Sequence, residues 1–181
     1  MEPTRRRTNR DLRLVRLLSP ELVELWEYIE FELDEETGER IYPDESIITE
    51  IILRRVSEVL DRTGLVKNVK RLGDELLYRE SQSSTVLGNG IAIPHVRSKN
   101  VRDLAMCFLR YPDGAPMKGV ESIEIVNFVF GIVTPIYEGD TDYQKVYRKL
   151  LNIFKTDPSF SEELMEMTAP GEIVRILKMR E

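Results

Sequence analysis

The chain has 181 residues, of which 41% are hydrophobic and 32% are charged, as in ordinary soluble globular proteins. Its 26 basic and 32 acidic residues give a net charge of −6, which argues against a nucleic-acid partner for the domain as a whole. One cysteine excludes an internal disulfide, and no apolar run reaches the roughly 18 residues of a membrane span. The sequence from Met1 to Arg7 lacks the apolar segment of a signal peptide, so we expect no membrane insertion and a cytoplasmic location.

The first 45 residues contain a basic segment and an acidic segment. Residues 1–13 are arginine-rich and poor in apolar side chains, which predicts a basic disordered tail before a domain over residues 14–181. Residues 14–26 predict a short strand and a turn at Ser19-Pro20. Residues 27–45 form an acidic insert whose apolar flanks around residues 35–39 favour a β-hairpin. The insert suits either of two roles, covering a sheet edge or contacting a partner, and we favour the first.

Two helices follow the insert. The first is expected to be capped by Asp44 or Ser46 and to end at Gly64. Its apolar residues are Ile47, Ile48, Ile51, Ile52, Val56, Val59 and Leu60. The second spans about residues 69–80, with leucines along one face.

The C-terminal half alternates strands and helices. Strands are predicted at 104–110, around a buried and unreactive Cys107, and at 123–133, which is apolar enough to be covered on both faces. Four proline and glycine residues between them predict a loop. These are Pro112, Gly114, Pro116 and Gly119. Helices are expected at about 141–155, 159–168 and 170–179, and this interleaving predicts an α/β fold.

The most informative segment is Gly88-Asn89-Gly90-Ile91-Ala92-Ile93-Pro94-His95, which contains the only histidine of the chain. Glycine and asparagine suit a positive φ and leave backbone N–H groups open to a ligand. Pro94 biases Ile93 towards an extended conformation. The segment therefore predicts a tight turn, a short apolar strand, and a histidine where that strand ends.

The residues in and around this segment fit phosphoryl transfer, which needs a nucleophile and positive groups for the phosphate oxygens. A neutral imidazole is a good nucleophile near pH 7, so His95 is the candidate, and Arg79 is the candidate phosphate clamp. Further phosphate-binding candidates offer a hydroxyl, a backbone N–H or a second guanidinium. They are Ser84, Thr85, Gly88, Asn89, Gly90 and Arg97.

Each of these assignments has a structural alternative that the residues leave open. A lone histidine beside apolar residues is often a core residue, and Arg79 suits the carbonyls at a helix end. Asn89 suits a turn with positive φ, and Ser84 and Thr85 suit a turn cap.

Together with Arg79-Glu80-Ser81-Gln82-Ser83-Ser84-Thr85, the histidine segment resembles one family. It is similar to the mannitol/fructose-type enzyme IIA domain of the bacterial phosphoenolpyruvate-dependent sugar phosphotransferase system. The resemblance runs from about residue 14 to the C-terminus. It implies a single mixed β-sheet with helices packed on both faces. It also implies a phosphotransferase component whose His95 accepts a phosphoryl group from the small histidine-containing phosphocarrier protein.

Typical members of this family have a second histidine at the start of the long helix. The matching sequence here, Asp140-Thr141-Asp142-Tyr143-Gln144, has none, and Asp142 or Tyr143 occupies the position. A tyrosine hydroxyl can donate to phosphate, whereas a carboxylate would repel phosphate but can orient an imidazole N–H.

Two functions follow from these observations. The first is a phosphohistidine carrier that passes its phosphoryl group to a IIB domain or a regulatory target, and the regulatory role is favoured because the chain has no room for IIB or IIC domains. The alternative is a IIA-like module that is not phosphorylated and works by protein interaction or anion sensing. One histidine and one buried cysteine do not make a metal-ligand set, so neither a metal nor another cofactor is expected.

Overall fold

The computed structural model describes residues 12–137 and 141–181, and its centre is a six-stranded mixed sheet. The strand order is β1-β7-β8-β5-β4, and β6 also pairs with β8. The strands are β1 (Val23–Glu24), β4 (Val86–Gly88), β5 (Ile91–Ala92), β6 (His95–Ser98), β7 (Ala105–Lys118) and β8 (Ile123–Pro135). The tail predicted over residues 1–13 lies outside the described residues, apart from its last two.

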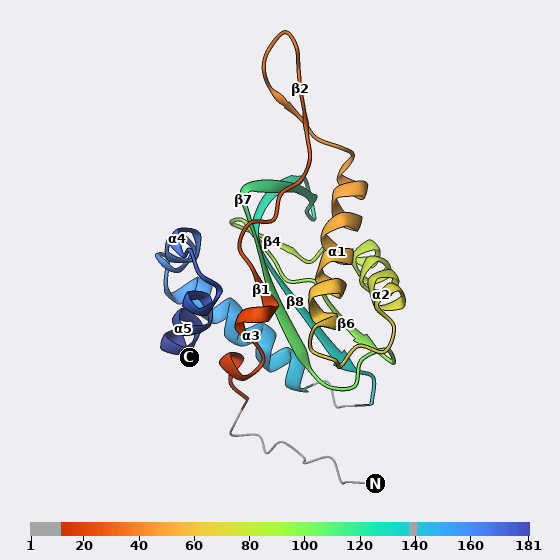
Figure 1. The fold of residues 1–181 in the computed structure, drawn as a ribbon, viewed down its shortest axis with the longest axis vertical. Coiled ribbons are helices and arrows are strands. Elements are labelled where there is room, and N and C mark those ends of the chain that lie inside the picture. The colour runs from red at the N-terminus through yellow and green to blue at the C-terminus, as the bar shows by residue number, and fades with distance from the viewer. Residues whose placement is uncertain (1–11, 138–140) are drawn as a thin grey trace.

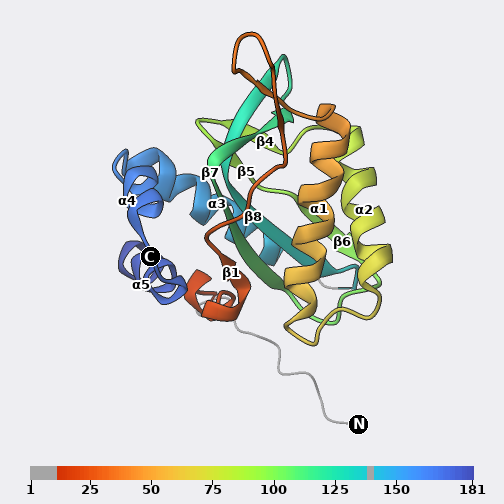
Figure 2. The ribbon, with the colours of Figure 1, turned by 45° about the horizontal axis from the view of Figure 1, so that its top comes forward.

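Helices cover both faces of this sheet. On one face lie α1 (Glu45–Asp61) and α2 (Val69–Gln82), and on the other lies α3 (Thr141–Thr156) (Figures 1 and 2). The chain ends in α4 (Phe160–Glu166), which packs against α3, and α5 (Pro170–Arg180). α5 packs against the two short 3-10 turns η1 (Leu14–Arg16) and η2 (Pro20–Leu22). The predicted α/β class, with one mixed sheet between helices, is therefore confirmed. Among the described helices, none is both long and apolar enough to cross a membrane.

The short strands β5 and β6 behave as one interrupted strand along β8. Both run parallel to β8, with Ile91 opposite Phe128 and His95 opposite Ile132. Pro94 stands in the gap between them, where its missing N–H costs no ladder hydrogen bond. The histidine therefore follows the short apolar strand, as the sequence predicts, and opens the next one.

The apolar face of α1 differs from the prediction at two positions. Ile48, Ile52 and Val56 are fully buried, but Ile47 and Ile51 are 50% and 45% exposed. The buried stripe faces the sheet, and residues 47 and 51 lie one turn apart on the outer side of the helix. Of the two proposed caps, Asp44 is at the N-cap, although its side chain makes no capping hydrogen bond.

The loop predicted between the two long strands is itself strand. β7 continues to Lys118, and its pairing with β8 shifts register between Arg110 and Ala115. Gly114 lies within this bulge with φ +79°, a conformation that glycine adopts without strain. Proline and glycine residues thus mark a bulge here instead of a loop.

The predicted hairpin in the acidic insert is confirmed. β2 (Glu32–Leu33) and β3 (Arg40–Ile41) pair antiparallel, and Gly38 has φ +71° in the turn. At its start the insert reaches the edge of the main sheet, where the Glu27 N–H donates to the Arg110 carbonyl of β7 at 3.1 Å. The hairpin strands do not cover that edge, because they form their own sheet and project beyond one end of the molecule (Figure 1). β1 instead occupies the edge of the main sheet, paired with β7.

Candidate functional site

The imidazole of His95 is oriented by two different partners. Its Nδ1 lies 2.8 Å from the backbone carbonyl oxygen of Ile93, and its Nε2 lies 3.3 Å from Nη2 of Arg79. A carbonyl can only accept a hydrogen bond and a guanidinium can only donate one. We therefore assign the ring proton to Nδ1, which leaves the lone pair on Nε2 facing Arg79.

The surroundings of His95 keep its ring neutral. Partial burial is the main cause that lowers the pKa of His95 below its usual 6.5, because a buried site disfavours the charged imidazolium. The positive charge of Arg79 lowers this pKa further, whereas the bond to Ile93 and the carboxylate of Glu80 oppose the shift. The lowered pKa therefore favours the neutral imidazole near pH 7.

Arg79 lies in the last turn of α2 and has two contacts. Its Nη1 donates to the carbonyl oxygen of Ser83 at 2.9 Å, beyond the helix end, and its Nη2 faces His95. Arg79 therefore both binds a carbonyl beyond the helix end and contacts the imidazole of His95. The first contact fixes the guanidinium so that the second can point at the ring.

The neighbouring Glu80 closes the loop after α2. Its carboxylate accepts hydrogen bonds from the Thr85 backbone N–H at 2.9 Å and from the Thr85 hydroxyl at 2.5 Å. The carbonyl of Thr85 accepts in turn from the Ile93 N–H at 3.0 Å. Thr85 is therefore buried, and its hydrogen bonds link the loop after α2 to the strand that leads to His95.

Helix α3 brings two tyrosine rings to the imidazole. Tyr143 is stacked on it, with ring centroids 5.7 Å apart and planes inclined by 23°. Tyr147, one helix turn later, meets it edge-on at 5.5 Å. Asp142 instead pairs with Lys145 at 3.7 Å, so Tyr143 is the one of the two candidates that contacts the ring. Sequence reasoning missed Tyr147, which its four-residue spacing from Tyr143 could have indicated.

The turn at Gly88, Asn89 and Gly90 does not reach the histidine. All three residues have the positive φ that the sequence predicts, +85°, +52° and +78°. The carbonyl of Gly90 accepts from the backbone N–H groups of Asn127 and Phe128, five and four residues before the position on β8 that faces His95. That separation corresponds to about 13–16 Å along a strand, so these N–H groups do not surround the imidazole.

Two further phosphate-binding candidates have their contacts elsewhere. The hydroxyl of Ser84 donates to the carbonyl oxygen of Lys118 at 2.8 Å. Arg97 is two residues after His95 on β6, and its Nη2 donates to the carbonyl oxygen of Ile136 at 2.9 Å. Alternate residues of a strand share one face, so Arg97 is on the side of β6 to which His95 belongs.

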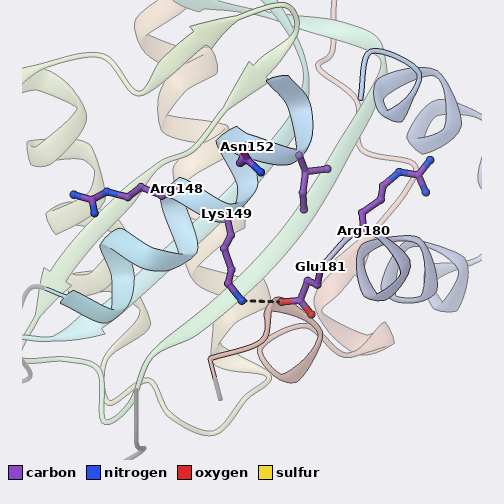
Figure 3. A pocket seen from close by; sticks show the side chains of 6 residues that line it. Arg148, Lys149, Asn152, Arg180 and Glu181 are labelled. Carbon is purple, nitrogen blue, oxygen red and sulfur yellow. Dashed lines mark ion pairs between the residues drawn. The ribbon is translucent and has the colours of Figure 1, made fainter. Parts of the chain in front are cut away.

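A separate basic cavity of about 490 Å³ lies between α3 and α5 (Figure 3). Lys149 pairs with Glu181 at 3.6 Å, and Arg180 pairs with Asp157 at 2.6 Å. The Glu181 carboxylate also accepts from the backbone N–H of Leu14. The hydrogen bond and ion pairs around this cavity thus connect the end of the C-terminal helix to η1 and α3. Within residues 12–137 and 141–181, no group of three histidine, cysteine or acidic residues has the arrangement of a metal site.

The fold and the sequence identify the class of protein. The family model "Phosphoenolpyruvate-dependent sugar phosphotransferase system, EIIA 2" matches residues 39–179. The chain therefore belongs to this family. It is 28% identical over 137 residues to the fructose-specific EIIABC component of Bacillus subtilis, a match that covers 76% of this chain and 21% of that protein. The chain thus spans about a fifth of that relative's length.

Solved structures agree on the fold. The nitrogen regulatory protein IIA-Ntr of Neisseria meningitidis has a TM-score of 0.71 and 21% identity, covering 91% of this chain and 98% of the other. The IIA mannitol domain of Escherichia coli has a TM-score of 0.65 and 24% identity, covering 88% and 98%. The mixed sheet with helices on both faces is accordingly the IIA fold.

Proposed function

We propose that the protein is a phosphohistidine carrier and that Nε2 of His95 accepts the phosphoryl group. The observation that carries the proposal is the pair of opposed contacts on the imidazole. The Ile93 carbonyl holds the proton on Nδ1, and the Nε2 lone pair faces a guanidinium that matches phosphate oxygens. Membership of the EIIA 2 family supports the same chemistry.

The transfer requires few groups. Nε2 of His95 attacks phosphorus in line, and the P–N bond of the donor phosphohistidine breaks with its electron pair returning to the donor imidazole. Arg79 gives up its hydrogen bond to Nε2 and donates to the phosphate oxygens. The hydroxyl of Tyr143, at the position of the family's second histidine, is the second donor. Ser84, Thr85 and the turn at residues 88–90 support the loop and strand that carry His95.

The proposed phosphoryl donor is the histidine-containing phosphocarrier protein, and the recipient is a IIB domain or a regulatory target. Support for a IIB partner comes from the complex of the Escherichia coli mannitol IIA with phosphorylated IIB, whose IIA has a TM-score of 0.65 to this chain. Support for a regulatory role comes from the similar fold of the nitrogen regulatory IIA protein. A cytoplasmic location follows from these partners.

The test is phosphoryl loading followed by intact mass spectrometry. Purified protein is incubated with phosphoenolpyruvate, enzyme I and the phosphocarrier protein, beside a known IIA domain as positive control. We expect one acid-labile phosphoryl group on the wild type and none on His95→Ala. Arg79→Gln should slow loading by about 100-fold, because it removes the cation that faces the incoming group.

A folded wild type that stays unloaded while the positive control is loaded would contradict the carrier. The chain would then be a IIA-like module for protein interaction or anion sensing. That alternative draws on Tyr143, which stands where the family has its second histidine. Isothermal titration with inorganic phosphate would test the anion-sensing form, with Arg79→Gln as the variant expected to lose binding.

A further inference from the structure

The edge contact between Tyr147 and His95 suggests a role for a residue that the phosphoryl transfer itself does not use. Tyr147 lies one turn after Tyr143 on α3, and its ring centroid is 5.5 Å from that of the imidazole, with the planes inclined by 61°. Both tyrosines also pack against the hydrophobic core. Packing therefore holds the ring of Tyr147 in place, and this ring restricts the movement of the imidazole on one side.

A histidine ring needs such a neighbour to stay in one orientation, because its χ2 torsion is broad and roughly two-fold. Rotation by half a turn would exchange Nδ1 with Cδ2 and Nε2 with Cε1. The flipped ring would present carbon to the Ile93 carbonyl, and Nε2 would leave the line towards Arg79. One hydrogen bond at 2.8 Å and one at 3.3 Å oppose this rotation from two sides of the ring. The tyrosine rings bound the remaining side, towards α3.

We propose that Tyr147 is a positioning residue: its ring holds the His95 imidazole in the orientation that keeps the proton on Nδ1 and aims Nε2 at Arg79. The inference rests on the proposed function only for its effect on transfer. Its effect on the ring itself is independent of any phosphoryl donor. It also differs from a space-filling role, because a space-filling residue would stabilise the fold without fixing the histidine tautomer.

The experiment compares Tyr147→Phe, which keeps the ring, with Tyr147→Leu, which keeps an apolar side chain without it. Tyr28→Leu is the control, because Tyr28 is 67% exposed and lies in the acidic insert, outside the family match. The chain has one histidine, so ¹⁵N-resolved NMR of the imidazole reports the Nδ1–H tautomer of His95 without assignment. The initial rate of phosphoryl loading is measured on the same samples.

We expect Tyr147→Leu to mix the two tautomers and to slow loading by about 10- to 100-fold. Tyr147→Phe and Tyr28→Leu should keep the Nδ1–H tautomer and load within about threefold of the wild type. The inference is overturned if Tyr147→Leu keeps the wild-type tautomer, or if Tyr147→Phe loses the tautomer as fully as the leucine variant. If the wild type is not loaded at all, the proposed function fails and the tautomer measurement alone decides the role of Tyr147.

Discussion

At the residue scale, the chemistry of this protein depends on which nitrogen of His95 carries a proton. The Ile93 carbonyl comes from the chain just before the histidine, and Pro94 between them fixes the local backbone. This short segment therefore supplies the acceptor for the proton on Nδ1. Arg79, by contrast, is sixteen residues earlier and reaches Nε2 only because α2 ends beside β6.

The first prediction concerns the pKa of His95. Burial and the charge of Arg79 both disfavour the imidazolium, so titration of the single histidine by NMR should give a pKa below 6.5. Arg79→Gln should raise this pKa towards 6.5. Arg71→Gln, at an exposed site two turns earlier on α2, removes the same charge and should leave the pKa unchanged. An unchanged pKa in Arg79→Gln would contradict the electrostatic account.

The same shift affects stability with a definite sign. The folded histidine has the lower pKa, so the unfolded chain binds more protons below about pH 6.5. This group therefore weakens folding as the pH falls through that value, and its contribution is absent above it. Urea denaturation at pH 7.5 and pH 5.5 should show a smaller pH-dependent loss in His95→Gln than in the wild type.

At the element scale, α1 can approach the sheet closely because β8 has glycine at position 131. A Cβ on Gly131 would lie 2.4 Å from Cγ1 of Val56 and 2.9 Å from Sγ of Cys107. Burial in this contact raises the pKa of the Cys107 thiol to about 12, as an unreactive cysteine requires. The distance between α1 and β8 is thus limited by the sizes of Val56, Cys107 and Gly131.

The second prediction follows from this contact. Gly131→Ala should destabilise the protein by about 2 kcal/mol, because the added methyl overpacks a site between a helix and the central strand. Gly171→Ala is the matched control, since nothing lies within 4 Å of its new Cβ and it sits in the first turn of α5. Both are measured by urea denaturation. Equal midpoints for the two variants would show that α1 can shift without cost.

The elements also show where sequence reasoning succeeds and where it stops. Helices α1 and α2, the hairpin and the positive-φ turn at residues 88–90 follow from periodicity, capping and turn chemistry, all of which are local. The bulged half of β7 does not, because Pro112 and Gly114 suggest a loop until pairing with β8 is known. The four-residue spacing places Tyr147 on the same face of α3 as Tyr143, but no local pattern specifies that this face meets His95.

At the scale of the whole molecule, one buried arginine ties the sheet to the C-terminal helices. Arg110 on β7 is 1% exposed, and its guanidinium donates to the carbonyls of Leu25, Leu164, Met165 and Met167 at 2.7–3.0 Å. Those carbonyls belong to the chain after β1 and to the end of α4. The arginine therefore satisfies carbonyls at the end of α4 and links them to the chain after β1.

The third prediction tests this link. Arg110→Met should lower the free energy of unfolding by about 3 kcal/mol, because it leaves several buried carbonyls without a donor. Arg102→Met, at an exposed position just before β7, should change it by less than about 0.5 kcal/mol. Urea denaturation measures both, and similar losses in the two variants would remove Arg110 from this role.

Charge is also distributed unevenly over the whole molecule. Residues 27–45 contain nine acidic residues and one arginine, a net charge of −8, so the other residues carry +2 of the total of −6. Composition alone predicted an acidic protein without indicating that the acidity is concentrated in the projecting insert. The net charge of −6 therefore reflects the charge of the insert and does not describe the charge on the surface around His95.

The most direct measurement of the central claim is the position of the phosphoryl group on the ring. The protein is loaded from phosphoenolpyruvate through enzyme I and the phosphocarrier protein, and ³¹P and ¹⁵N NMR of His95 identify the nitrogen bonded to phosphorus. The geometry of Ile93 and Arg79 predicts phosphorus on Nε2 with the proton retained on Nδ1. Phosphorus on Nδ1, or a wild-type protein that gains no phosphoryl group, would contradict the account.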